Sequence, residues 1–152
     1  MAAREEFLIV GVGNPHRRDD GIGPYVIREL CRIFEERKAV RLLDRFQLGP
    51  DLIEDLRHAR LIVLVDAAVK DLKEGREWSR VRPEYEALPY LTHHVPPRYL
   101  LWLLKSVYGR SPTAWQVTIQ GKDFGHGRGL SPFTKKKGRE VMREIVDLYT
   151  LR

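Results

Sequence analysis

Apolar residues recur along the chain in short continuous runs, most of them rich in branched side chains. Such runs predict strands that are covered on both faces, because β-branched residues pack well on a pleated surface. Residues 61–66 (LIVLVD) show this pattern most strongly and are predicted as a central parallel strand. Further strands are predicted at residues 6–12, 39–45 and 114–119, and an edge strand at residues 76–82.

Amphipathic stretches lie between these strands. Apolar residues at helical spacing predict a helix over residues 21–37. Proline is common in the first turn of a helix, and this signal predicts that three more helices start at Pro50, Pro96 and Ser131. At the third of these, serine precedes the proline as a helix cap. We expect the second of these three helices to end at Gly109 and the third near residue 150.

Strands that alternate with helices in this way are typical of α/β proteins. The sequence therefore predicts one α/β domain over residues 1–152, with a mostly parallel twisted sheet flanked by helices on both faces.

Composition narrows the class of protein. The 152 residues contain one cysteine, Cys31, which excludes an internal disulfide and a zinc site built from cysteines. The apolar runs are too short to span a membrane, and the N-terminal run is predicted as a strand and not as a secretion signal. We therefore expect a cytoplasmic protein.

The net charge of +6 is compatible with a nucleic-acid, anionic-surface or acidic-protein partner. The charges are spread along the chain except at residues 135–137, where three lysines are predicted to form the solvated face of a helix. The charge pattern therefore does not favour a nucleic-acid patch.

The glycine-rich start is not a dinucleotide fingerprint. Gly11 and Gly13 fit the first two positions, but His16 occupies the third and the helix begins only near residue 20. A pyrophosphate could not rest on the N-terminus of that helix, as the fingerprint requires.

Carboxylates and histidines follow the predicted strands. Asp19 and Asp20 precede a helix and would commonly cap it, but one of two adjacent aspartates is left for another role. Asp66 ends the central strand, at the edge where α/β proteins bind ligands. With one residue of the pair His93 and His94, Asp20 and Asp66 could hold a divalent ion such as zinc or nickel and leave coordination positions open.

Other catalytic nucleophiles are not indicated. Cys31 lies in the middle of the amphipathic helix, where a small buried residue is expected and not a reactive thiol. The chain has neither a G-x-S-x-G elbow nor an H-E-x-x-H helix.

Residues 11–30 (GVGNPHRRDDGIGPYVIREL) closely resemble the opening motif of the hydrogenase maturation proteases: a glycine-x-glycine-asparagine loop, two acidic residues, then glycine-x-glycine leading into a helix. Later segments resemble the same family in the same order, so that the resemblance covers nearly the whole chain. These segments are FQLGPDL, LIVLVDAA, THHVPPRYLLWLLKSVYG and TIQGKDFGHGRGLSP.

The resemblance implies an endopeptidase that removes the C-terminal extension of a nickel-containing hydrogenase large-subunit precursor after nickel insertion. The family's metal-contacting trio, which also supplies the catalytic candidates, falls on Asp20, Asp66 and His94, with His93 as the competing register. The precursor would present the nickel, no organic cofactor is implied, and neither nucleic acid nor a membrane is an expected partner. Asn14 is expected to structure its loop, with a contact to the substrate backbone as the alternative.

Two other functions remain open. GVGNP also resembles the start of peptidyl-tRNA hydrolase, whose substrate would suit a basic protein, although that family has a histidine-asparagine pair near the position of Asp19, Asp20 and Gly21. A non-catalytic, metal-dependent binding module on the same fold is the other alternative, because a fold does not determine a function.

Overall fold

The computed structural model describes residues 6–89 and 94–151. Its centre is a five-stranded sheet with the strand order β2-β1-β3-β5-β4. The first four strands in this order run parallel, and β4 pairs antiparallel with β5 at one edge. The strands are β1 (Glu6–Val12), β2 (Val40–Arg45), β3 (Ala59–Ala68), β4 (Arg76–Val81) and β5 (Thr113–Gln120).

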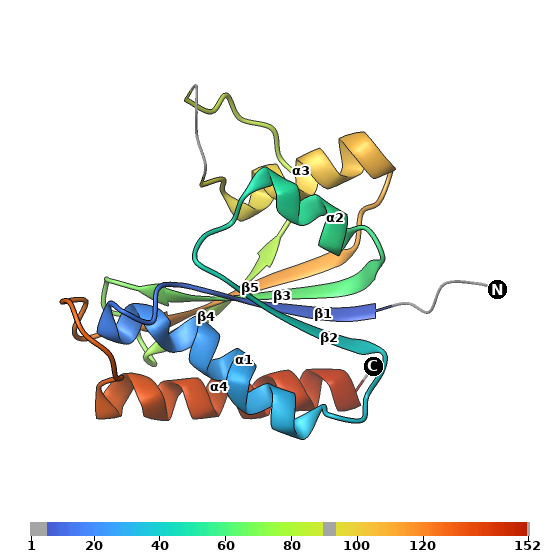
Figure 1. Cartoon of the computed structure of the whole chain (residues 1–152). Coiled ribbons are helices and arrows are strands. Elements are labelled where there is room, and N and C mark those ends of the chain that lie inside the picture. The colour runs from blue at the N-terminus through green and yellow to red at the C-terminus, as the bar shows by residue number, and fades with distance from the viewer. Residues whose placement is uncertain (1–5, 90–93, 152) are drawn as a thin grey trace.

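Helices cover both faces of the sheet, as Figure 1 shows. One face carries α1 and α4, and the opposite face carries α2 and α3. The helices are α1 (Ile22–Ile33), α2 (Ile53–Leu56), α3 (Pro97–Tyr108) and α4 (Pro132–Thr150), with the 3-10 turns η1 (Arg18–Gly21) and η2 (Pro50–Leu52) before α1 and α2. The predicted fold class, a mostly parallel sheet flanked by helices on both faces, is confirmed.

Alternating side chains of the central strands form two apolar cores. Leu8 and Val10 of β1 point towards the α2–α3 face, whereas Phe7 and Ile9 point towards the α1–α4 face. All four are fully buried, which is why β1 and β3 read as continuous apolar runs. The sheet is therefore fixed from both sides, and its loops are held at defined positions.

Two helix termini, the end of α3 and the start of α4, lie where the sequence predicted them. Gly109 ends α3 in the left-handed conformation with φ 66°, and the Ser131 side chain accepts a hydrogen bond from the Thr134 N–H at the start of α4. The first helix is shorter than predicted and ends at Ile33, and the segment from Pro50 forms only a 3-10 turn and one helical turn. Among the described helices, none is both long and apolar enough to cross a membrane.

Candidate functional site

The candidate site lies at the carboxyl edge of β1 and β3. These strands are parallel neighbours, and Gly11 of β1 lies opposite Val65 of β3. Asp66 follows Val65 directly, and Asp20 lies in η1, beyond a short loop after β1. Parallel strands end at the same edge of a sheet, so that the two carboxylates reach this edge from segments far apart in the sequence.

A close approach of backbones brings η1 over this edge. A Cβ atom on Gly23 would lie 2.5 Å from the carbonyl oxygen of Val12 and 2.8 Å from that of Val65. Only glycine allows the first turn of α1 to rest directly on the ends of β1 and β3. Asp20, three residues before Gly23, is thereby held near the edge that carries Asp66, close enough for its charge to act on Asp66.

The carboxylate of Asp20 affects the proton affinity of Asp66. The pKa of Asp66 is raised to about 6, chiefly because burial disfavours the charged form and additionally because of the negative charge of Asp20. A hydrogen bond of 2.8 Å from the Ala67 N–H opposes this shift. Within residues 6–89 and 94–151, no lysine or arginine forms an ion pair with Asp20 or Asp66. Such a pair of oxygen ligands without a counter-ion fits a divalent cation.

Asn14 fixes the position of the Asp20 carboxylate. The Asn14 N–H donates a hydrogen bond of 2.7 Å to Asp20 Oδ2, and Asn14 Oδ1 accepts one of 2.9 Å from the His16 N–H. Asn14 therefore has the loop-structuring role expected from the sequence. One carboxylate oxygen of Asp20 is committed to this loop, which leaves Oδ1 for a ligand.

The neighbouring Asp19 has a different role. It is fully buried and accepts hydrogen bonds from the N–H groups of Lys122, Asp123 and Ser131, at 2.7, 3.0 and 2.7 Å, and from the hydroxyls of Ser131 and Thr134. Burial raises the pKa of Asp19, but these hydrogen bonds outweigh burial and leave the pKa below its usual value. Asp19 therefore joins η1 to the loop 121–131 and to α4.

Neither aspartate caps the helix that follows it, because η1 and α1 begin without a side-chain cap. The expected helix cap is thus wrong, and the metal-ligand role of Asp20 stays a prediction. Composition and spacing gave no sign that Asp19 would bind a loop about a hundred residues further along the chain.

The histidine of the predicted trio precedes α3 and lies beside the loop after β2. His94 is exposed, and the next residue, Val95, is buried and donates a backbone hydrogen bond of 3.0 Å to Leu48 in the loop after β2. Within the part of the chain that the structure describes, no three His, Cys, Asp or Glu side chains come close enough together to hold a metal. His93 lies outside the described residues. The structure therefore pairs Asp20 with Asp66, and the histidine ligand stays a prediction.

Two other predictions need correction. Cys31 is exposed and not buried, because it lies on the outer edge of the amphipathic stripe of α1. Of the three lysines at residues 135–137, Lys137 is not solvated like the others: its ammonium group lies 3.1 Å from Glu140 and packs over the ring of Phe133.

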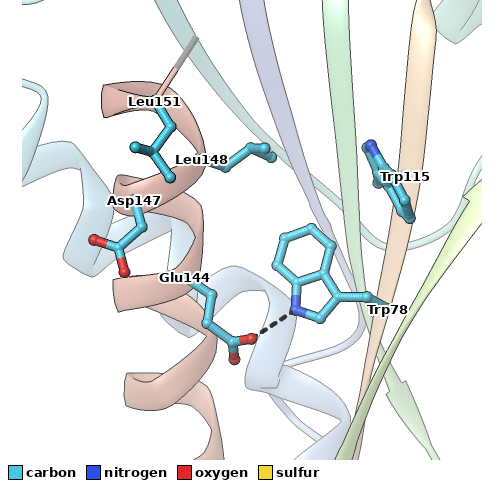
Figure 2. Close-up of a pocket in the computed structure, with 6 residues that line it drawn as sticks. All are labelled: Trp78, Trp115, Glu144, Asp147, Leu148 and Leu151. Atoms are coloured by element: carbon cyan, nitrogen blue, oxygen red, sulfur yellow. Dashed lines mark hydrogen bonds between the residues drawn. The ribbon is translucent and has the colours of Figure 1, made fainter.

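A separate apolar pocket of about 380 Å³ lies between β4, β5 and the C-terminal half of α4 (Figure 2). Trp78 and Trp115 form its sheet side, and Trp78 Nε1 donates a hydrogen bond of 3.1 Å to Glu144 on α4. Asp20 and Asp66 do not line this pocket.

Several solved hydrogenase maturation proteases have the same arrangement of elements. A [NiFe] hydrogenase maturation protease HycI from Thermococcus kodakarensis superimposes with a TM-score of 0.71, over 93% of this chain and 90% of its own, at 21% sequence identity. The hydrogenase maturating endopeptidase HybD from E. coli gives a TM-score of 0.70, over 94% and 91% of the two chains, also at 21% identity. The chain has the fold of the hydrogenase maturation proteases.

Sequence comparison points to the same proteases. A curated protein of Methanocaldococcus jannaschii, named "Putative hydrogenase maturation protease", is 23% identical over 110 residues. The match covers 66% of this chain and 64% of the relative, slightly less than two thirds of its length. No protein-family model matches the chain. The resemblance to the maturation proteases that the sequence motifs indicated is confirmed.

Proposed function

We propose that this protein is an endopeptidase that removes the C-terminal extension from the large-subunit precursor of a nickel-containing hydrogenase. The observation that supports it best is the pairing of Asp20 and Asp66 at the carboxyl edge of a sheet with the maturation-protease fold. The motif at residues 11–30 supports the same function, since it supplies the close approach of α1 and the loop that holds Asp20.

Nickel belongs to the substrate in this proposal. The precursor presents a metal ion with incomplete protein coordination, and Asp20, Asp66 and His94 add ligands from the protease. The negative charges of the two carboxylates repel each other, and a divalent cation bound between them relieves this repulsion. A precursor without nickel offers no such attraction, and cleavage then depends on prior metal insertion.

Calorimetry tests the metal site directly. We would titrate the metal-free protein with nickel and with cadmium, and compare Asp66→Asn, His94→Ala and His93→Ala with the exposed control Asp147→Asn on α4. We expect binding that weakens at least tenfold in Asp66→Asn, because a ligand charge is lost while the side-chain shape is kept. The two histidine variants decide the register, and the control should bind as the wild type does.

A cleavage assay tests the activity. Purified precursor, with and without nickel, is incubated with the wild type and with Asp20→Asn and Asp66→Asn, and the released peptide is identified by mass spectrometry. The proposal predicts cleavage of the nickel-loaded precursor by the wild type alone. Equal cleavage by all three proteins, or cleavage that ignores nickel, would show that the two aspartates do not read the metal.

A further inference from the structure

A second site lies beside η1, where basic side chains from four segments line one pocket of about 370 Å³. The pocket lies between the loop after β1, helix α1, the loop 121–131 and the start of α4. We call it the arginine pocket; its main lining residues are Arg18, Arg28, Arg128, Lys135, Tyr25 and Leu130. Among the residues that the structure describes, no carboxylate lines it.

The charges in the arginine pocket are largely uncompensated. Arg18 has an acidic neighbour, Asp123, at 3.5 Å. Within the described residues, Arg28, Arg128 and Lys135 have no carboxylate within 4.0 Å. Like charges gathered in a hollow concentrate a positive potential there, and an anion that enters relieves their repulsion.

The wall of the pocket is rigidly built. The Arg18 N–H donates to the Gly127 carbonyl at 3.0 Å, and the Gly127 N–H donates to the His16 carbonyl at 2.8 Å. Arg18 has the uncommon φ of 48°, and a Cβ atom on Gly127 would lie 3.0 Å from Arg18 Nη2. The two loops therefore hold Arg18 in place before any ligand arrives, which lowers the entropic cost of binding.

The arginine pocket adjoins the candidate site. Arg18 and Gly21, which line it, belong to the same four-residue turn as Asp20. A chain that enters the pocket can therefore continue to the Asp20–Asp66 edge. Tyr25 and Leu130 add apolar surface, which suits a peptide with its mixed side chains.

We propose that the arginine pocket binds acidic side chains of the polypeptide that is cleaved at the Asp20–Asp66 edge, and so positions an acidic stretch next to the scissile bond. This inference rests on the proposed endopeptidase function. A peptide is favoured over a nucleic acid because carboxylates lie next to the pocket. A phosphate backbone carries charge at every residue and would be repelled by Asp20 and Asp66, whereas a peptide carries acid only where its sequence places it.

Fluorescence anisotropy with the full-length protein tests the pocket without any cleavage step. The probes are a labelled glutamate-rich peptide, the same peptide with glutamine in place of glutamate, and a single-stranded oligonucleotide of equal charge. The pocket variant is Arg28→Gln with Arg128→Gln, both exposed residues whose replacement should leave the fold intact. The control, Lys105→Gln with Arg143→Gln, removes the same charge from exposed positions on α3 and on the second half of α4.

We expect the glutamate peptide to bind the wild type and the control equally, and the pocket variant roughly tenfold or more weakly, because two charge-assisted contacts are lost. The glutamine peptide should bind none of them measurably. Equal loss in the pocket variant and the control would show general attraction to a basic protein and would overturn the proposal. The proposal would also be overturned if the oligonucleotide bound the wild type more tightly than the glutamate peptide does and lost this binding in the pocket variant.

Failure of this inference is distinguishable from failure of the proposed function. If the wild type cleaves a nickel-loaded precursor and the pocket variant cleaves it with an unchanged KM, the pocket proposal fails alone. If the wild type cleaves no precursor but binds the glutamate peptide through the pocket, the anion site stands and the endopeptidase proposal fails.

Discussion

Two adjacent aspartates in this protein have very different hydrogen-bonding environments. Asp19 is surrounded by hydrogen-bond donors, which hold its pKa below the usual value in spite of burial. Asp20 has one described donor, the Asn14 N–H, and faces a second carboxylate. A carboxylate saturated with donors has no free oxygen for a ligand. Asp19 therefore braces the site, and Asp20 is the one available to bind a cation.

Replacing Asp19 by alanine should destabilise the whole fold. The substitution leaves three partly buried backbone N–H groups, of Lys122, Asp123 and Ser131, without their acceptor. We expect the free energy of unfolding to fall by roughly 3–5 kcal/mol, measured by urea unfolding. Asp123→Ala is the control, because Asp123 is exposed and its pairing with Arg18 should contribute less than about 1 kcal/mol. Similar losses in both variants would contradict the bracing role.

The sequence analysis named Asp20 as the candidate ligand, but it gave no sign of the contacts that Asp19 makes. The partners of Asp19 that identify it, Ser131 and Thr134, lie 112 and 115 positions away. Local patterns carry no information on a contact of this range. Ser131 was correctly predicted as a helix cap, yet nothing marked it as the residue that ties α4 to η1.

At the scale of elements, the apolar pattern predicted most of the fold, because the spacing of apolar residues along the chain reflects which faces of each strand or helix are buried. The first strand was predicted at residues 6–12 and is observed at Glu6–Val12. Helix α1 ends at Ile33 and not at residue 37, since the polar residues 35–38 have no apolar face to bury. Predicted ends were least accurate where tertiary contacts, and not a local cap, end the element.

The contact of α1 with the sheet should be the most sensitive element-scale feature. In Gly23→Ala the new methyl group would overlap the backbone of Val12 and Val65, which cannot move aside, so that α1 must shift away from β1 and β3. We expect a loss of roughly 2–4 kcal/mol in unfolding free energy. Nickel binding should weaken as well, because the shift carries Asp20 away from Asp66.

Gly138→Ala on α4 is the matched control. There the added methyl group meets the end of the flexible Ile22 side chain, which can rotate, and alanine improves helix propensity by about 1 kcal/mol. We expect a change below about 1 kcal/mol and unchanged nickel binding, measured by urea unfolding and calorimetry. If Gly23→Ala binds nickel as tightly as this control does, the backbone contact does not position Asp20.

At the scale of the whole molecule, the sequence showed basic residues spread along the chain, whereas the fold gathers several of them in one pocket. Arg18, Arg28 and Arg128 come from η1, from α1 and from the loop 121–131. The hydrogen bonds of Asp19 and Gly127 bring these segments together. The acidic pair could be anticipated from motif and topology, but the arginine pocket could not, because it depends on contacts that local patterns do not encode.

The stability of the whole molecule should depend on pH in a way that isolates Asp66. A carboxyl group whose pKa rises from 3.8 unfolded to about 6 folded binds its proton more tightly in the folded state. The folded state is therefore penalised as Asp66 ionises: the penalty is absent below about pH 4, grows between about pH 4 and pH 6, and is complete above. Asp19 acts in the opposite direction, since its lowered pKa adds stability that is lost only in acid.

Asp66→Asn removes the Asp66 contribution and keeps an oxygen that can accept the Ala67 hydrogen bond. We expect this variant to match the wild type near about pH 4 and to be more stable near about pH 8 by on the order of 1–2 kcal/mol. One pKa unit corresponds to about 1.4 kcal/mol, and the partial exposure of Asp66 reduces the effect. Urea unfolding at both pH values measures the difference. If the variant gained equal unfolding free energy at both pH values, Asn would stabilise by packing. If the gain is confined to the higher pH, the negative charge of Asp66 destabilises the fold, as expected of a carboxylate that binds a cation.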